Sequence, residues 1–88
     1  MKNSDVAAAW YYGKAAESGT LRSDGKSIFS YAMKIGEINE KGDRVVFDYR
    51  ISGVSRTTAH HIELATEVAN IICHPDKIQS HFSKTVLL

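Results

Sequence analysis

The sequence lacks the residues and segments that mark several common classes of protein. Its 88 residues contain one cysteine, Cys73, so no disulfide can form within the chain, as in most proteins of a reducing cytoplasm. No apolar run approaches the ~20 residues that a membrane-spanning helix needs, and the first residues lack the apolar segment of a signal peptide. The net charge of +1 gives no general attraction to nucleic acid or to an anionic membrane. We therefore expect a soluble, cytoplasmic protein without membrane contact, whose electrostatic sites are local.

The composition is that of one small globular domain. Hydrophobic residues make up 43% of the chain and charged residues 24%, which argues against disorder. A chain of this length has room for one core and buries a modest share of its surface, so a homodimer is compatible with it. We predict one α+β domain over residues 1–88.

Two helices are predicted near the ends of the chain. The first spans 3–18, because small and aromatic residues recur at helical spacing: Val6, Ala9, Trp10, Gly13 and Ala16. The second spans 57–74, is capped by Thr57 or Thr58, and is amphipathic, with an apolar arc that includes Ile62, Ala65 and Val68. Pro75 then either stops this helix or begins a short helix over 76–83, followed by an apolar tail.

An antiparallel sheet of about three strands is predicted between the helices, over 20–23, 26–38 and 44–51. Asp24-Gly25 is typical of a two-residue hairpin turn, and such a turn would place Leu21 opposite Ile28. Further along the predicted strand 26–38, the apolar residues alternate onto the opposite face of the sheet from Ile28. Either both faces of the sheet are partly covered, or a bulge shifts the register. In the last strand, four residues are expected to face inward, namely Val45, Phe47, Tyr49 and Ile51, and three outward, namely Val46, Asp48 and Arg50.

The sequence offers little support for a metal site or for catalysis. His60 and His61 are adjacent, so on a helix they point about 100° apart, and the chain has no pair of histidines at i, i+4. Cys73 is predicted near a helix C-terminus, where the helix dipole opposes a thiolate. We therefore expect no metal, no cofactor and no enzymatic activity.

His61 allows two interpretations. Helical geometry puts it in the middle of the apolar arc of the second predicted helix, within its first turns. It is then either a half-buried histidine whose ring bonds to the backbone or water, or a ligand-facing or pH-sensitive imidazole. The sequence favours the structural interpretation.

The start of the second predicted helix is the best local site for an anion. Free backbone N–H groups, two hydroxyls and a guanidinium could converge there from Arg56, Thr57 and Thr58, next to His60. The alternative is a threonine cap beside an exposed arginine. No capping box is present, because the residues three positions after the two threonines are histidines.

Basic residues also gather on the predicted hairpins, with tyrosines among them: Arg22, Lys26, Lys34, Arg44 and Arg50, with Tyr31 and Tyr49. Aromatic and cationic side chains on a sheet can bind single-stranded nucleic acid. Acidic residues are interspersed and nearly cancel the charge, so a solvated, mixed-charge face is the favoured interpretation.

One linear pattern resembles a group of short, largely uncharacterised bacteriophage proteins. In that group a Trp-containing helix precedes a hairpin of the form D-G-x-S-[LI]-[YF]-S-Y and a helix that starts T-T-x-x-H. The matching residues here are Trp10, Asp24-Gly25, Ser27 to Tyr31, Thr57-Thr58, His60-His61 and Ala65. The resemblance covers about residues 8–70. Phe29 replaces the more usual tyrosine, and the tail after Pro75 has no counterpart.

The resemblance implies a phage or prophage origin and an accessory role in a host cell. The leading hypothesis is a non-enzymatic protein that binds a host or phage protein complex. Its most concrete version is an inhibitor of a bacterial defence complex, similar to anti-CRISPR proteins, that acts by occlusion. One alternative is a nucleic-acid-binding accessory protein that uses Arg22, Lys26, Arg50 and Arg56. The other is a binder of a small anionic ligand at Arg56, Thr57, Thr58 and His61.

Overall fold

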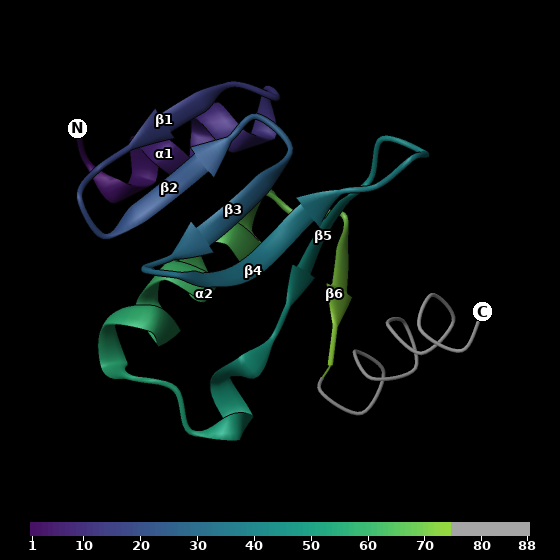
Figure 1. The fold of residues 1–88 in the computed structure, drawn as a ribbon. Helices are drawn as coiled ribbons and strands as arrows, with labels where there is room; N and C mark the ends of the chain where they lie inside the picture. Colours follow the sequence, from purple (N-terminus) through teal and green to yellow (C-terminus); the bar gives the residue numbers. More distant parts are fainter. Residues whose placement is uncertain (75–88) are drawn as a thin grey trace.

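The structure is a computed structural model that describes residues 1–74. The predicted short helix over 76–83 and the tail lie outside the described residues. The elements follow in the order α1 (Asn3–Tyr11), β1 (Ala15–Glu17), β2 (Leu21–Asp24), β3 (Ser27–Ser30), β4 (Met33–Ile38), β5 (Arg44–Phe47), the 3-10 helix η1 (Tyr49–Ser52), α2 (Arg56–Val68) and β6 (Ile71–Cys73). Figure 1 shows this path.

The strands form one six-stranded sheet in chain order, β1 to β6. Neighbours are antiparallel except for β5 and β6, which are parallel and are joined by a crossover through α2. The α+β class is confirmed, but the prediction of about three strands is too low. No helix among residues 1–74 is both long and apolar enough to cross a membrane.

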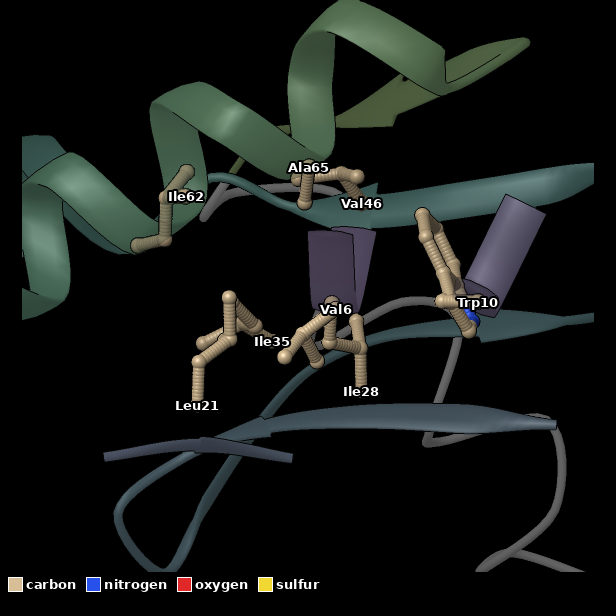
Figure 2. Close-up of a cluster of buried hydrophobic side chains, with 8 residues drawn as sticks. All are labelled: Val6, Trp10, Leu21, Ile28, Ile35, Val46, Ile62 and Ala65. Atoms are coloured by element: carbon tan, nitrogen blue, oxygen red, sulfur yellow. The ribbon is translucent and has the colours of Figure 1, made fainter. Parts of the chain in front are cut away.

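The main core lies between one face of the sheet and the two helices. Figure 2 shows its eight buried side chains, which come from α1, four strands and α2: Val6, Trp10, Leu21, Ile28, Ile35, Val46, Ile62 and Ala65. Trp10 is fully buried, and its indole Nε1 donates to the carbonyl oxygen of Lys26 at 2.9 Å. This contact satisfies the polar edge of the largest core side chain.

The first helix is shorter than the predicted 3–18. Gly13 adopts φ +72, a left-handed conformation in which its N–H donates to the carbonyl of Trp10. The chain then turns back, and Ala15–Glu17 pairs with β2. The glycine that was placed inside the predicted helix therefore terminates it, and strand pairing overrides the helix propensity of Ala15 and Ala16.

The first hairpin has a different register from the predicted one. Leu21 lies opposite Ser30 rather than Ile28, because β2 extends to Asp24 and the connection is Gly25-Lys26. The carboxylate of Asp24 accepts the backbone N–H groups of Lys26 and Ser27, an Asx turn that fixes the connection. The shift is two residues, so Leu21 still faces the core.

The predicted strand 26–38 is two strands, β3 and β4, joined at Tyr31-Ala32. The register shifts at Ile28/Phe29, where β4 carries an extra residue, Ile35. Ile35 is thereby turned into the core. Of the two alternatives for this hairpin, the bulge is the one observed.

Strand β5 is buried on both faces, which the simple alternation did not predict. Val46, expected to face outward, lies in the main core. Val45 and Phe47 form a second cluster on the other face. The strand ends at Phe47 because Asp48 caps η1, and Ile51, expected to face inward, is 80% exposed.

The second helix also differs from its predicted bounds of 57–74. It begins after Ser55, whose Oγ accepts the N–H of Thr58, so the predicted cap at Thr57 or Thr58 is wrong. Its end is fixed by Asn70, which exchanges hydrogen bonds with the backbone of Arg44. The residues that follow therefore join the sheet as β6 beside β5.

Candidate functional site

A polar network with a buried centre lies between the sheet and the start of α2. At its centre is His61, which is 0% exposed. Its Nδ1 lies 2.7 Å from Oγ of Ser30, and its Nε2 lies 3.3 Å from both Nδ2 of Asn3 and Oγ1 of Thr20. We call these four residues, together with Ser18, Thr58 and Ser55, which continue the chain of hydrogen bonds, the His61 network: Asn3, Ser18, Thr20, Ser30, Ser55, Thr58 and His61.

The remaining bonds extend the network to the helix caps. Ser30 Oγ donates to Oγ1 of Thr58 at 2.9 Å, and Ser55 Oγ donates to the same atom. At the other end, Ser18 Oγ donates to Oδ1 of Asn3. Among the described residues, no buried side-chain nitrogen or oxygen lacks a partner. The network therefore joins α1, the β1–β2 loop, β3 and α2 without leaving a buried polar atom unsatisfied.

These bonds favour one tautomer of the imidazole. Because Ser18 donates to Oδ1 of Asn3, the amide presents its Nδ2 to the ring, and Nδ2 can only donate. When Nε2 accepts this bond, the ring proton lies on Nδ1 and is donated to Ser30. Burial, and secondarily the neighbouring His60, lower the pKa of His61 below its ordinary value of 6.5. We infer a neutral imidazole that is protonated on Nδ1.

The pair formed by Ser30 and His61 has the spacing of a nucleophile and its general base. In this structure, however, Ser30 is 1% exposed and its hydroxyl proton points to Thr58. Neither residue is open to a substrate, so we interpret the pair as part of the structural network.

Tyr31 lies next to this network, on the β3–β4 turn. It has φ +55, in the left-handed region that a bulky side chain rarely adopts, and its side chain is 56% exposed. Its N–H donates to the carbonyl of Thr20 at 2.8 Å, and its ring centroid lies 6.1 Å from that of His61. The chain therefore holds an aromatic side chain outward at a strained position, a feature that is often associated with function.

The structure brings together most of the residues predicted at the start of the second helix. Thr58 and His61 are buried in the network, whereas Arg56, Thr57 and His60 are exposed on the first turns of α2. Because Oγ1 of Thr58 already interacts with Ser30 and Ser55, its hydroxyl does not face solvent as the predicted anion site requires.

Arg50 belongs to a separate feature beside α2. Its guanidinium forms two bonds to the carboxylate of Asp48, at 2.7 and 2.8 Å. This pairing holds the pKa of Asp48 below its ordinary value and raises that of Arg50. Asp48 also accepts the N–H of Arg50 and thereby caps η1, which carries the exposed Ile51.

The other predicted basic residues do not form one surface with these. Arg22 packs its guanidinium over the ring of Phe29, 4.4 Å from the centroid, on the sheet face away from the helices. Lys26 lies in the β2–β3 connection, and Lys34 pairs with Glu37 at 3.3 Å. Arg44 donates to the carbonyl of Tyr11, which anchors the end of α1. The basic residues of the hairpins are thus dispersed, and several are engaged within the chain.

The sequence did not point to the network residues that lie outside the second helix: Asn3, Ser18, Thr20, Ser30 and Ser55. The one usable signal was Ser30, a small polar residue between two aromatic residues in a strand. No group of three or more histidine, cysteine or acidic residues within 1–74 is placed to hold a metal ion.

Comparison with protein-family models, with curated proteins and with solved structures gave no match.

Proposed function

We propose that this chain acts by binding another macromolecule through a surface centred on Tyr31. We define the Tyr31 surface as Tyr31 and the exposed residues on the first turns of α2, Arg56, Thr57 and His60. The ring contact between Tyr31 and His61 places the turn beside these turns of α2. The surface thus combines an aromatic anchor with polar and cationic groups, as protein interfaces commonly do.

The observation that carries the proposal is the exposed Tyr31 at positive φ. A left-handed conformation destabilises a non-glycine residue by roughly 1–2 kcal/mol, and an exposed aromatic ring recovers little of this by burial. A folded partner would recover it, since tyrosine is among the residues that dominate binding energy at interfaces. The hydrogen bonds of Ser30 and of the Tyr31 N–H hold the backbone of the turn before binding, which lowers the entropy lost on association.

The most concrete version of the proposal is an inhibitor of a bacterial defence complex that acts by occlusion. It draws on the resemblance to short phage proteins and on the size of the chain. The partner would then be a host or phage protein complex, and the chain would have no catalytic role. Ile51, on the 3-10 helix next to α2, is exposed and offers a second apolar anchor.

The test is retention of a partner by tagged wild-type chain from bacterial lysate, compared with two variants, Tyr31→Gly and Tyr31→Asn. Both replacements tolerate positive φ, so the turn is kept while the ring is lost. Tyr12→Ser is the matched control, because Tyr12 is 71% exposed and lies at the end of α1 rather than on the Tyr31 surface. We expect both Tyr31 variants to lose the partner and Tyr12→Ser to retain it.

Equal retention by all four proteins would contradict the proposal. A gel-shift series separates the nucleic-acid alternative, because such binding weakens steeply with salt. The wild-type chain could shift nucleic acid at low salt, and Arg22→Ala could abolish this shift while Tyr31→Gly does not. In that case the binding surface is instead the sheet face away from the helices, where Arg22 lies.

A further inference from the structure

We propose that His61 is an acid-sensitive switch for the Tyr31 surface: protonation of its imidazole releases the β3–β4 turn and thereby weakens binding of the partner. The effect on binding rests on the proposed function. The structural step, release of the turn, concerns this chain alone and can be tested without a partner.

The geometry links the imidazole to Tyr31 by two routes. Through Nδ1 the ring bonds to Ser30, the residue that directly precedes Tyr31. Through Nε2 it bonds to the hydroxyl of Thr20, whose carbonyl oxygen accepts the N–H of Tyr31. The position of the turn therefore depends on two contacts of one buried side chain.

A charged imidazole does not fit these surroundings. Once Nε2 carries a proton, it can donate to Oγ1 of Thr20, but Nδ2 of Asn3 then faces it as a second donor, so the bond between the ring and Asn3 is lost unless the amide reverses. Reversal would require Ser18 to accept from Nδ2 instead of donating to Oδ1. Burial adds to the effect, since a charge without a counter-ion is disfavoured away from water.

Within residues 1–74, the groups around the ring supply no negative charge that would stabilise the protonated form. The groups that face the ring are Asn3 on α1, Thr20 in the β1–β2 loop, Ser30 on β3, Tyr31 in the β3–β4 turn and His60 on α2. None is a carboxylate, and His60 disfavours a second positive charge. Asp5, on α1, is exposed and accepts the N–H of Lys2. Protonation is therefore favoured only in a state in which the network has opened.

The test is hydrogen exchange of the Tyr31 amide in the full chain, followed by NMR between pH 7.5 and 5.0. Rates are divided by the intrinsic rates at each pH, which gives the equilibrium for opening. Below about pH 6.5, we expect opening to increase by up to roughly tenfold per pH unit, because an open state with an ordinary histidine binds the proton that the closed state excludes. The Asn70 amide, which donates to the Arg44 carbonyl at 2.9 Å, is the internal reference: its protection factor should exceed that of Tyr31, because local opening of the turn exposes Tyr31 without separating Asn70 from β5.

Two variants identify the group responsible. His61→Asn removes the titrating ring but keeps an amide donor for Ser30, and should make opening of the turn independent of pH. His60→Asn is the matched control at the exposed neighbouring position and should retain the pH dependence. The carbon chemical shifts of the His61 ring in the wild-type chain should change over the same pH range as the opening of the turn. This comparison assigns the pH dependence to His61 even if His61→Asn does not fold.

The proposal is overturned if the protection of Tyr31 stays constant, if Tyr31 and Asn70 have equal protection factors at every pH, or if His60→Asn abolishes the response. Once a partner is known, its affinity is measured over the same pH range. If the turn opens in acid while affinity stays constant, binding occurs elsewhere, and the proposed function fails while the structural step stands.

Discussion

The Oγ of Ser30 lies 2.7 Å from Nδ1 of His61, which ties the end of β3 to a helix that begins 26 residues later in the chain, at Arg56. Tyr31 follows Ser30 directly and is exposed. The buried histidine and the exposed aromatic ring therefore belong to one arrangement, in which a satisfied polar network positions a strained surface residue.

Replacing Tyr31 with glycine should stabilise the protein. Relief of the left-handed conformation gains about 1–2 kcal/mol, and the added freedom of glycine in the unfolded chain removes about 0.5–1 kcal/mol of this. We expect the free energy of unfolding, measured with urea, to rise by roughly 0.5–1 kcal/mol. A decrease would mean that the contact of the ring with His61 outweighs the backbone strain.

Removing the hydroxyl of Ser30 should destabilise the protein. In Ser30→Ala, the Nδ1–H of His61 loses its acceptor and Thr58 loses a donor, both in a buried position. Leaving buried polar groups unpaired destabilises by about 1–3 kcal/mol. Ser4→Ala, at an exposed position of α1, is the control and should stay within about 0.5 kcal/mol of wild type. Equal stabilities of the two variants would argue against the network.

Stability should depend on pH through His61. Its pKa in the folded chain is lowered from 6.5, mainly by burial. The unfolded chain therefore binds the proton first, so stability is complete above about pH 6.5 and falls as the pH decreases toward the folded pKa, by up to about 1.4 kcal/mol per unit. Urea titrations at a series of pH values should show this loss in wild type and in His60→Asn.

The same titrations in His61→Asn should be flat until much lower pH. A second loss is expected near and below pH 3.8, where Asp48 becomes protonated, because its bonds to Arg50 lower its folded pKa from that value. If His61→Asn still loses stability near pH 6, another group is responsible for that loss.

Gly36 should not tolerate a side chain. It lies opposite Val46 in the sheet, and a Cβ there would come within 2.9 Å of the carbonyl oxygen of Val45 and 3.2 Å of Cζ2 of Trp10. Since the nearest atom is backbone, the strand must shift. We expect Gly36→Ala to lower the free energy of unfolding by about 1–3 kcal/mol, and thermal denaturation should show it. A neutral effect would mean that β4 and β5 can separate without loss.

Local patterns in the sequence were sufficient for the class of the fold and for the existence of both helices. They failed where contacts distant in sequence decide the structure. Ala15 and Ala16 favour a helix, yet pair as a strand once Gly13 has turned the chain. The β3–β4 turn carries no glycine or asparagine at Tyr31-Ala32, so turn chemistry gave no sign of it. Val46 broke the expected alternation because β5 packs on both faces.

The candidate site was predictable only in part. Helical spacing placed His61 on the inner side of α2, and the favoured interpretation was a half-buried histidine bonded to backbone or water. In the structure His61 is fully buried and its ring bonds to side chains. Its partners Asn3 and Thr20 lie 58 and 41 residues away, and no pattern in one sequence pairs them. The strain at Tyr31 is likewise a property of its backbone conformation, and a tyrosine in a sequence does not predict a positive φ.

The most direct test of the central claim, that the Tyr31 surface is where the chain binds, is the dissociation constant of the partner for three purified chains. These are wild type, Tyr31→Gly and Tyr12→Ser, measured by calorimetry at pH 7.5. We expect Tyr31→Gly to be at least as stable as wild type but to bind at least about tenfold more weakly, as for loss of an interface aromatic, while Tyr12→Ser binds as wild type does. An unchanged dissociation constant for Tyr31→Gly would contradict the account.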